Sequence, residues 1–303
     1  MLHIVGEGDA GERLDRFLRA RMPEHSRAAI ADLLSAGAVR VNGRGADKGR
    51  ALAAGDRVEV ADTALDPNPT PDPELRLRVL YEDDWLVAVD KPGGVPSHPL
   101  RAGETGTVAN ALLARYPELR DVGYRKLEPG LLHRLDNGTS GVLLAARTPE
   151  AFAALREQHE RGGFDKHYLA LCAGYVRGPR IERAFLDASQ RRVRVAPDAL
   201  ALSEAARPIT TEVLLAVPRN AFSLVTVRVA FAARHQVRAH LAALGHPIAG
   251  DSLYGGPMLT GLARHFLHAS YVALLHPKTQ QRLEIRAPLA PDLEELLRVL
   301  DGS

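Results

Sequence analysis

Residues 133–141, HRLDNGTSG, bring a histidine, an arginine and an aspartate together immediately before a turn. Apolar runs flank this segment, so Asp136 is expected at a strand end close to apolar walls. The Asn-Gly pair permits a tight turn with positive φ, and the Thr-Ser pair after it can hydrogen-bond the turn backbone. Asp136 is therefore either a turn-forming residue or a reactive carboxylate. Arg134 is either its ion-pair partner or a contact for a ligand phosphate.

A second residue that could take part in chemistry is Lys91. It follows the apolar run WLVAVD and opens the loop KPGGVPSHP. A lysine on a glycine-containing loop often meets anions. The loop lacks the GxxxxGK[ST] pattern of a nucleotide-binding P-loop, and an ordinary surface loop is the alternative.

A third segment, DKHYLALCAG at residues 165–174, has the pattern of a strand. Side chains alternate along a strand, so Lys166 and Tyr168 should share one face while His167 lies on the other. Tyr168 precedes an apolar run. It is either a residue of an active site or a core tyrosine whose hydroxyl is satisfied.

The fourth segment, ARHQVRAHLAALGHPIAGDSLYGG at residues 233–256, combines a helical pattern with turn-rich ends. Arg234 and Arg238 are four residues apart, so they share a helix face. A basic helix face beside a glycine loop suits contact with phosphates, and a solvated basic face is the alternative.

The composition excludes several other chemistries. The 303 residues carry a net charge of only +2, so a nucleic-acid surface requires local clustering of basic residues. The single cysteine, Cys172, excludes a disulfide framework and thiolate zinc sites. HExxH and GxSxG are absent and no GxGxxG follows an expected strand, so we expect no metal and no cofactor. Without an 18-residue apolar run or a leader-like N-terminus, we expect a cytoplasmic protein with no membrane segment.

Changes in composition divide the chain into three expected parts. Residues 1–61 contain helical patterns at 14–21 and 26–36, and two short strands, VRV before an Asn-Gly turn and RVEV. Residues 62–74 hold four prolines and should form a semi-rigid linker. Residues 75–303 form a larger, strand-rich domain.

Short strands that follow one another closely in residues 75–303 predict an α+β domain with a large mixed, mainly antiparallel sheet and helices packed on it. The expected strands lie near 76–81, 85–90, 141–146, 167–173, 209–217, 222–230, 270–275 and 282–286. The expected helices are 107–116, 149–160, 234–244 and 291–300.

Taken together, these segments resemble the RluA family of RNA pseudouridine synthases. HRLDNGTSG is similar to the family signature HRLDxxTSG, KPGGVPSHP to its KPxGxxxH loop, and KHYLALCAG to its tyrosine-bearing strand. HQVRAHLAALGHPIAGDSLYG is similar to the HQIRVHLaxxGHPIxGDxxYG block, and RHFLHASYVALLHP to a late block that contains LHA. Residues 1–60 resemble an S4-type RNA-binding domain, although their bases and acids nearly balance, ten to nine.

The resemblance implies conversion of uridine to pseudouridine within RNA. It also implies a small S4-like α+β domain followed by the catalytic domain. It gives Asp136 the position of the catalytic aspartate, Tyr168 that of the active-site tyrosine, and Arg238 that of the arginine paired with the aspartate. We expect RNA contacts from seven further residues: Arg134, Lys91, His133, Lys166, Arg234, His235 and Gln236.

One segment departs from the family pattern. The family has a GRTHQ-like start to its helix block, whereas residues 232–236 are AARHQ, with the arginine one position late. We expect this departure to change RNA contact or loop geometry at that point. It leaves the expected aspartate, tyrosine and second arginine intact.

Two other classes of function compete with the synthase. The first is a non-catalytic RNA-binding protein on the same scaffold, for example in ribosome assembly. The second is a glycoside hydrolase with two carboxylates, for which Asp84 and Asp90 are near in sequence but match no motif. The S4-like domain favours 23S ribosomal RNA as substrate, with transfer RNA as the alternative, and we expect a monomer.

Overall fold

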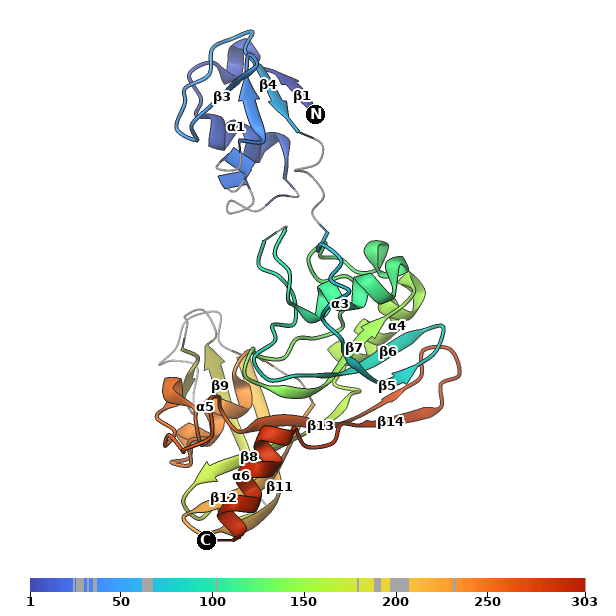
Figure 1. Ribbon diagram of the computed structural model, residues 1–303, viewed down its shortest axis with the longest axis vertical. Coiled ribbons are helices and arrows are strands. Elements are labelled where there is room, and N and C mark those ends of the chain that lie inside the picture. The colour runs from blue at the N-terminus through green and yellow to red at the C-terminus, as the bar shows by residue number, and fades with distance from the viewer. Residues whose placement is uncertain are drawn as a thin grey trace. The chain divides into compact units, whose positions relative to one another are not determined.

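The computed structural model describes residues 1–23, 25, 30–31, 33–34, 37–61, 68–101, 103–178, 180–187, 192–196, 207–230 and 233–302. The chain forms two compact units, one of Met1–Thr70 with Pro99–Thr105 and one of Pro71–His98 with Gly106–Ser303 (Figure 1). Much of the expected helix at 26–36 lies outside the described residues. None of the described helices has the length and apolar character needed to cross a bilayer.

The first unit contains a four-stranded antiparallel sheet and helix α1 (Leu14–Arg21). The strand order is β1 (Leu2–Ile4), β4 (Arg57–Val60), β2 (Val39–Val41) and β3 (Arg44–Gly45). Asn42 and Gly43 both have positive φ, 54° and 76°, so the expected Asn-Gly hairpin turn is present. The apolar side of α1 packs on the sheet and forms this unit's own core.

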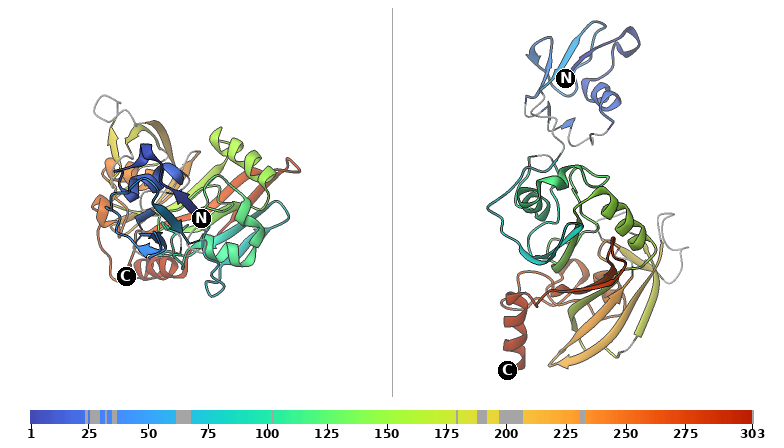
Figure 2. Two further views of the ribbon diagram at one scale, coloured as in Figure 1. Left: turned by 90° about the horizontal axis from the view of Figure 1, so that it is seen from above. Right: turned by 90° about the vertical axis from the view of Figure 1, so that its right-hand side faces the viewer.

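The second unit is built on a ten-stranded sheet that is strongly twisted and curved (Figure 2). Its strands are β5 (Arg78–Glu82), β6 (Leu86–Lys91), β7 (Ser140–Ala146), β8 (Asp165–Ala173), β9 (Arg180–Asp187), β10 (Arg194–Ala196), β11 (Arg207–Arg219), β12 (Phe222–Val229), β13 (Leu267–Leu275) and β14 (Arg282–Arg286). Their order is β10-β9-β11-β12-β8-β13-β7-β6-β5, and β14 pairs with β13. Every pair is antiparallel except β13 with β7, so the expected mixed, mainly antiparallel sheet is confirmed.

Strands β9 and β10 were not predicted. The segment RRVR at residues 191–194 was assigned to no strand from its sequence. Arg194 begins β10, while Arg191 lies outside the described residues. The charged sequence of β9, RIERAFLD, has too little apolar alternation to be identified locally, and the strand is held by pairing with β11 and β10.

The helices of the second unit are α3 (Val108–Arg115), α4 (Pro149–Glu160), α5 (Gln236–Ala243) and α6 (Pro291–Asp301), with 3-10 turns at Pro117–Asp121 and Ser252–Tyr254. Thr148 caps α4 through a 3.1 Å bond from Ala151 N, with Pro149 in the first turn, as expected. Helix α5 begins two residues later than expected, because His235 adopts a left-handed conformation with φ of 56°.

Helices cover both faces of the sheet around β6 and β7. Val87 and Val89 of β6 belong to the core cluster that includes side chains of α3, α5 and α6. Leu86 and Ala88 belong to the opposite cluster, which includes side chains of α4. This burial on both faces holds the sheet rigid where the segment 131–139 enters β7.

Candidate active site

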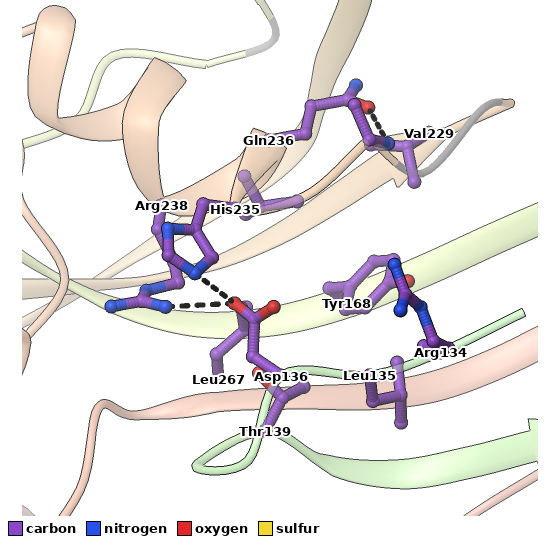
Figure 3. Close-up of a pocket in the computed structure, with 12 residues that line it drawn as sticks. Arg134, Leu135, Asp136, Thr139, Tyr168, Val229, His235, Gln236, Arg238 and Leu267 are labelled. Atoms are coloured by element: carbon purple, nitrogen blue, oxygen red, sulfur yellow. Dashed lines mark hydrogen bonds and ion pairs between the residues drawn. The ribbon is translucent and has the colours of Figure 1, made fainter. Parts of the chain in front are cut away.

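Asp136 lies in the turn that leads into β7. Thr139 N donates to Asp136 O at 2.9 Å and closes a turn at the predicted place, but neither Asn137 nor Gly138 has the positive φ that the Asn-Gly pair permits. The Asp136 side chain is 23% exposed and faces a pocket, called here the Asp136 pocket. The pocket is lined by Arg134, Leu135, Asp136, Thr139, Tyr168, Val229, Ala233, His235, Gln236, Val237, Arg238 and Leu267 (Figure 3).

Arg238 of α5 is the cationic partner of Asp136. Its Nη1 donates to Asp136 Oδ2 at 2.9 Å, while Nε and Nη2 donate to the two carboxylate oxygens of Asp251 at 2.6 and 2.9 Å. Burial disfavours the charged guanidinium, but the bonds to Asp251 and Asp136 outweigh burial and raise the pKa of Arg238. The sequence left open whether Arg134 pairs with Asp136; in the structure Arg238 has that place.

The carboxylate of Asp136 is engaged on one oxygen only within the described part of the chain. Oδ2 accepts from Arg238 and lies 3.9 Å from His235 Nε2. The other oxygen points away from Arg238, toward the side of the pocket on which Tyr168 lies (Figure 3). One oxygen is therefore held and the other is available to a ligand.

Tyr168 combines the two alternatives that its sequence position left open. It is part of the hydrophobic core, with 5% of its surface exposed, and its side chain also lines the Asp136 pocket. Burial, with a smaller contribution from the charge of Asp136, raises the pKa of its phenol. Tyr168 is therefore a neutral aromatic wall beside the carboxylate.

His235 and Gln236 bind the protein itself. His235 Nδ1 lies 3.1 Å from Tyr254 Oη, and burial lowers the pKa of its ring. Gln236 is only 2% exposed; its amide accepts from Ala233 N and donates to Thr210 O and Thr211 Oγ1. Because these hydrogen bonds are all made within the protein, the Gln236 amide holds the start of α5 against β11.

Lys91 does not lie on the surface, in contrast to its expected RNA contact. The residue is 0% exposed, and its ammonium donates to the carbonyl oxygens of Pro92, Val95 and Asn137 at 2.9, 2.5 and 3.0 Å. Burial is the main cause that lowers its pKa to about 7. Lys91 therefore braces the turn after Asp136.

Lys166 is also buried and His133 is half-buried, so neither lies on the surface as an RNA contact would. Lys166 is 3% exposed, and its Nζ lies 2.9 Å from His159 Nε2. The His133 ring lies near that of His159, and its buried Nδ1 has no hydrogen-bond partner among the described residues. Burial lowers the pKa of His133 well below its ordinary value, so the ring is neutral.

Arg134 and Arg234 are the two expected cationic contacts that remain exposed. The Arg134 side chain is 48% exposed and extends from the pocket, where Nη1 lies 3.1 Å from His98 Nε2 and 3.5 Å from Glu128 Oε1. Because the Arg134 side chain is itself half exposed, these contacts to two half-buried residues can be exchanged for a phosphate.

Two residues of the site were not identified from the sequence, Asp251 and Tyr254. Both belong to GDSLYGG, which the sequence analysis treated as a turn-rich helix end. The only available signal was the resemblance of this segment to the GDxxYG end of the family block. Among the described residues, no group of three or more histidine, cysteine, aspartate or glutamate side chains could hold a metal ion. Asp84 and Asp90 do not line the Asp136 pocket.

Comparisons with known proteins identify relatives of this chain. Residues 85–243 match the family model described as RNA pseudouridylate synthase, and residues 12–58 match the S4 domain. An uncharacterized RNA pseudouridine synthase of Chloroflexus aurantiacus is 36% identical over 98% of this chain and 92% of its own length. The ribosomal large subunit pseudouridine synthase D of Xanthomonas campestris is 32% identical over 98% and 91%. The solved structure of human RNA pseudouridylate synthase domain containing 4 has a TM-score of 0.60 at 21% identity, covering 74% of this chain and 92% of that one.

Proposed function

The chain belongs to the RNA pseudouridylate synthase family, and on this basis we propose that it converts specific uridines of 23S ribosomal RNA to pseudouridine, with Asp136 as the catalytic carboxylate. One observation carries the proposal. The Asp136 carboxylate is held on one oxygen by Arg238 and has its other oxygen open to a pocket that Tyr168 lines.

The reaction requires a group that acts on the ribose. The C1′–N1 bond of uridine breaks, the uracil turns, and C5 bonds to C1′; C5 loses a proton and N1 gains one. The reaction therefore balances without an oxidant, a reductant or a further substrate. A carboxylate at the C1′ side can act as a nucleophile or stabilise positive charge there. The open oxygen of Asp136 has this task, and Arg238 supplies a fixed positive charge beside it.

Tyr168 is proposed to hold the uracil while it turns. Because burial raises the pKa of its phenol, the hydroxyl stays protonated and is a poor acceptor for the C5 proton at neutral pH. An aromatic ring beside the carboxylate instead offers the base a stacking surface. This favours stacking over proton transfer as the role of Tyr168.

The target nucleotide must leave its helix stack to reach Asp136, at a cost of about a few kcal/mol. Arg134 and Arg234, both exposed, are the proposed contacts for the RNA backbone beside the pocket. Lys91, Lys166, His133 and Gln236 are proposed to support the site from within the protein, since they are buried or already bonded.

Residues 1–61 are proposed to be an S4-type RNA-binding domain, residues 62–74 a linker and residues 75–303 the catalytic domain. The match of residues 12–58 to the S4 domain supports the first of these. The relative from Xanthomonas is named for the large ribosomal subunit, which supports 23S RNA over transfer RNA. We further propose that the protein acts in the cytoplasm, where its substrate is made, as a monomer.

The test is to incubate the purified protein with three substrates that lack pseudouridine: 23S RNA, a reconstituted large-subunit particle, and total transfer RNA. Carbodiimide treatment followed by reverse-transcription stops maps each new pseudouridine. Discrete stops on 23S RNA or the particle support the proposal. Stops on transfer RNA alone move the substrate to that class.

Asp136→Asn separates the synthase from a non-catalytic RNA-binding protein. The substitution keeps the shape of the side chain, and Arg238 keeps both bonds to Asp251. We expect the rate to fall by more than about a thousandfold with the affinity for RNA unchanged. Tight RNA binding by a wild-type protein that forms no pseudouridine on any of the three substrates would establish the non-catalytic alternative.

A further inference from the structure

Arg238 makes more hydrogen bonds to Asp251 than to Asp136. Two of its nitrogens, Nε and Nη2, bind the two oxygens of Asp251, whereas Nη1 alone binds Asp136. A two-point contact between a planar guanidinium and a carboxylate fixes both the position and the plane of the guanidinium. A single contact leaves the plane free to rotate. The orientation that Arg238 presents to Asp136 is therefore set by Asp251.

Asp251 is itself held rigidly. Its side chain is 1% exposed. Asp251 N donates to Ile248 O at 3.1 Å, and Gly256 N donates to Asp251 O at 2.8 Å. A side chain at Gly256 would lie 1.8 Å from Ile248 O, so this tight turn requires glycine. Ile248 forms a bridge with Cys172 of β8, the strand that carries Tyr168. Asp251 is thus fixed to the framework of the pocket.

The Tyr254 ring contacts the same guanidinium. The Tyr254 ring lies 5.3 Å from Arg238 Cζ, within the range of a cation–π contact. Its hydroxyl accepts from Val193 N at 2.9 Å and lies 3.1 Å from His235 Nδ1. Arg238 therefore has its Nε–Nη2 edge on Asp251 and its Cζ over the Tyr254 ring, and only Nη1 extends to Asp136.

We propose that Asp251 is a positioning residue for the isomerisation. It occupies two nitrogens of Arg238, so only one reaches Asp136 and the second oxygen of Asp136 stays open to the ribose. Without Asp251, the guanidinium is free to turn and bind both oxygens of Asp136, which removes the oxygen that the reaction needs. The inference rests on the proposed function, because it concerns the step that Asp136 performs.

A purely structural role is the competing explanation, since a buried charge that loses its partner destabilises a protein. Stability alone does not distinguish the two explanations. Only the positioning role predicts a slower chemical step at unchanged RNA affinity, in a protein that is folded. It also predicts that the effect of Asp251 depends on the arginine at position 238.

The first experiment measures single-turnover rate constants with saturating RNA for wild type and Asp251→Asn. We expect the rate constant to fall by about tenfold or more and the Kd for RNA to change by less than about twofold. Asp83→Asn is the matched control. Asp83 also accepts several hydrogen bonds, from Tyr81 Oη, Trp85 N and Leu86 N, but it does not line the Asp136 pocket. It should lower the melting temperature and leave the rate constant unchanged.

The second experiment repeats the substitution in an Arg238→Lys background. A lysine ammonium is not planar and cannot make the two-point contact, so Asp251 no longer fixes the orientation of the group at position 238. Asp251→Asn should then change the remaining rate constant by less than about twofold. A further drop as large as that in the arginine background overturns the proposal. If Asp251→Asn alone does not fold, Asp251→Glu, which keeps the buried charge but displaces the two-point contact, is compared in both backgrounds instead.

The outcomes separate the two proposals. If wild type forms pseudouridine and Asp251→Asn forms it at the full rate, the positioning role is wrong and the proposed function stands. If wild type forms none on any RNA, the proposed function fails, and the positioning role fails with it because no reaction is left to position.

Discussion

Lys91 Nζ lies 3.0 Å from the carbonyl oxygen of Asn137, so a fully buried lysine joins the end of β6 to the turn that carries Asp136. The same ammonium binds the carbonyl oxygens of Pro92 and Val95 in the following loop. Gly94 N also donates to Asn137 O, at 2.8 Å. Two loops, 46 residues apart in sequence, are thereby held as one unit beside the catalytic carboxylate.

We predict that Lys91→Met lowers the free energy of unfolding by about 1–3 kcal/mol, because methionine keeps the volume of the stem but leaves carbonyl groups without their donor. Pseudouridine formation should slow as well, since the turn after Asp136 loses its brace. Urea unfolding measures the first effect and single-turnover kinetics the second. Lys126→Met, at an exposed position, is the control and should change neither quantity. An unchanged stability for Lys91→Met would contradict the bracing role.

For Tyr168, we predict that phenylalanine retains much more activity than alanine. The neutral phenol acts through its ring, which Phe keeps and Ala removes. Single-turnover rates should fall by less than about tenfold for Tyr168→Phe and by more than about a hundredfold for Tyr168→Ala. Equal losses in the two variants would show that the hydroxyl is essential and would restore proton transfer as its role.

Much of the site could be predicted because its residues lie in contiguous motifs. The turn after Asp136 follows from the Asn-Gly pair, and the strand of Tyr168 follows from apolar alternation. Asp136 and Arg238 are 102 residues apart in sequence. Their pairing was predicted only from the family resemblance, because local patterns contain no information on contacts between residues so far apart in the chain.

Burial of charged groups could not be predicted. Lys91 and Lys166 have the same residue type as solvent-exposed lysines, and their burial depends on the folded arrangement of the groups around them. Lys91 needs the Asn137 carbonyl, and Lys166 needs the rings of His159 and Phe164. The start of α5 was missed for a related reason, since the left-handed backbone of His235 is not evident from its neighbours in sequence.

Gly141 is predicted to be irreplaceable at the junction of three strands. It pairs with Lys91 of β6 and with Ala269 of β13, at the parallel contact of the sheet. Its φ is +110°, and a side chain there would lie 2.2 Å from Ala269 O. Gly141→Ala should therefore lower the free energy of unfolding by about 3 kcal/mol or more.

Gly178→Ala is the control for that measurement. A side chain at Gly178 meets its nearest atoms at an ordinary 3.5 Å, and its φ is not positive. Chemical denaturation should give a change within about 0.5 kcal/mol of wild type. If Gly141→Ala behaves like Gly178→Ala, the strands are less closely packed at this junction than the distances indicate.

The buried Lys166 makes stability depend on pH. Burial lowers its pKa to about 7 in the folded protein, whereas a lysine in an unfolded chain titrates near 10.4. Between about pH 7 and pH 10 the unfolded chain therefore binds a proton that the folded protein does not. Stability rises with pH in this window, by at most about 1.4 kcal/mol per pH unit for one group. Burial lowers the pKa of the neighbouring His159 to about 4, so His159 is neutral throughout the window.

We predict that Lys166→Met flattens this dependence. Lys91 has a similarly lowered pKa, so the variant should keep part of the rise and lose the part that belongs to Lys166. Urea unfolding at pH 7, 8 and 9 measures the slope, and Lys126→Met, which removes an exposed lysine, should reproduce the wild-type slope. The free energy of unfolding of the variant, relative to that of wild type, should be higher at pH 7 than at pH 9. A Lys166→Met slope equal to that of wild type would mean that Lys166 is charged in the folded protein and that its amine reaches water.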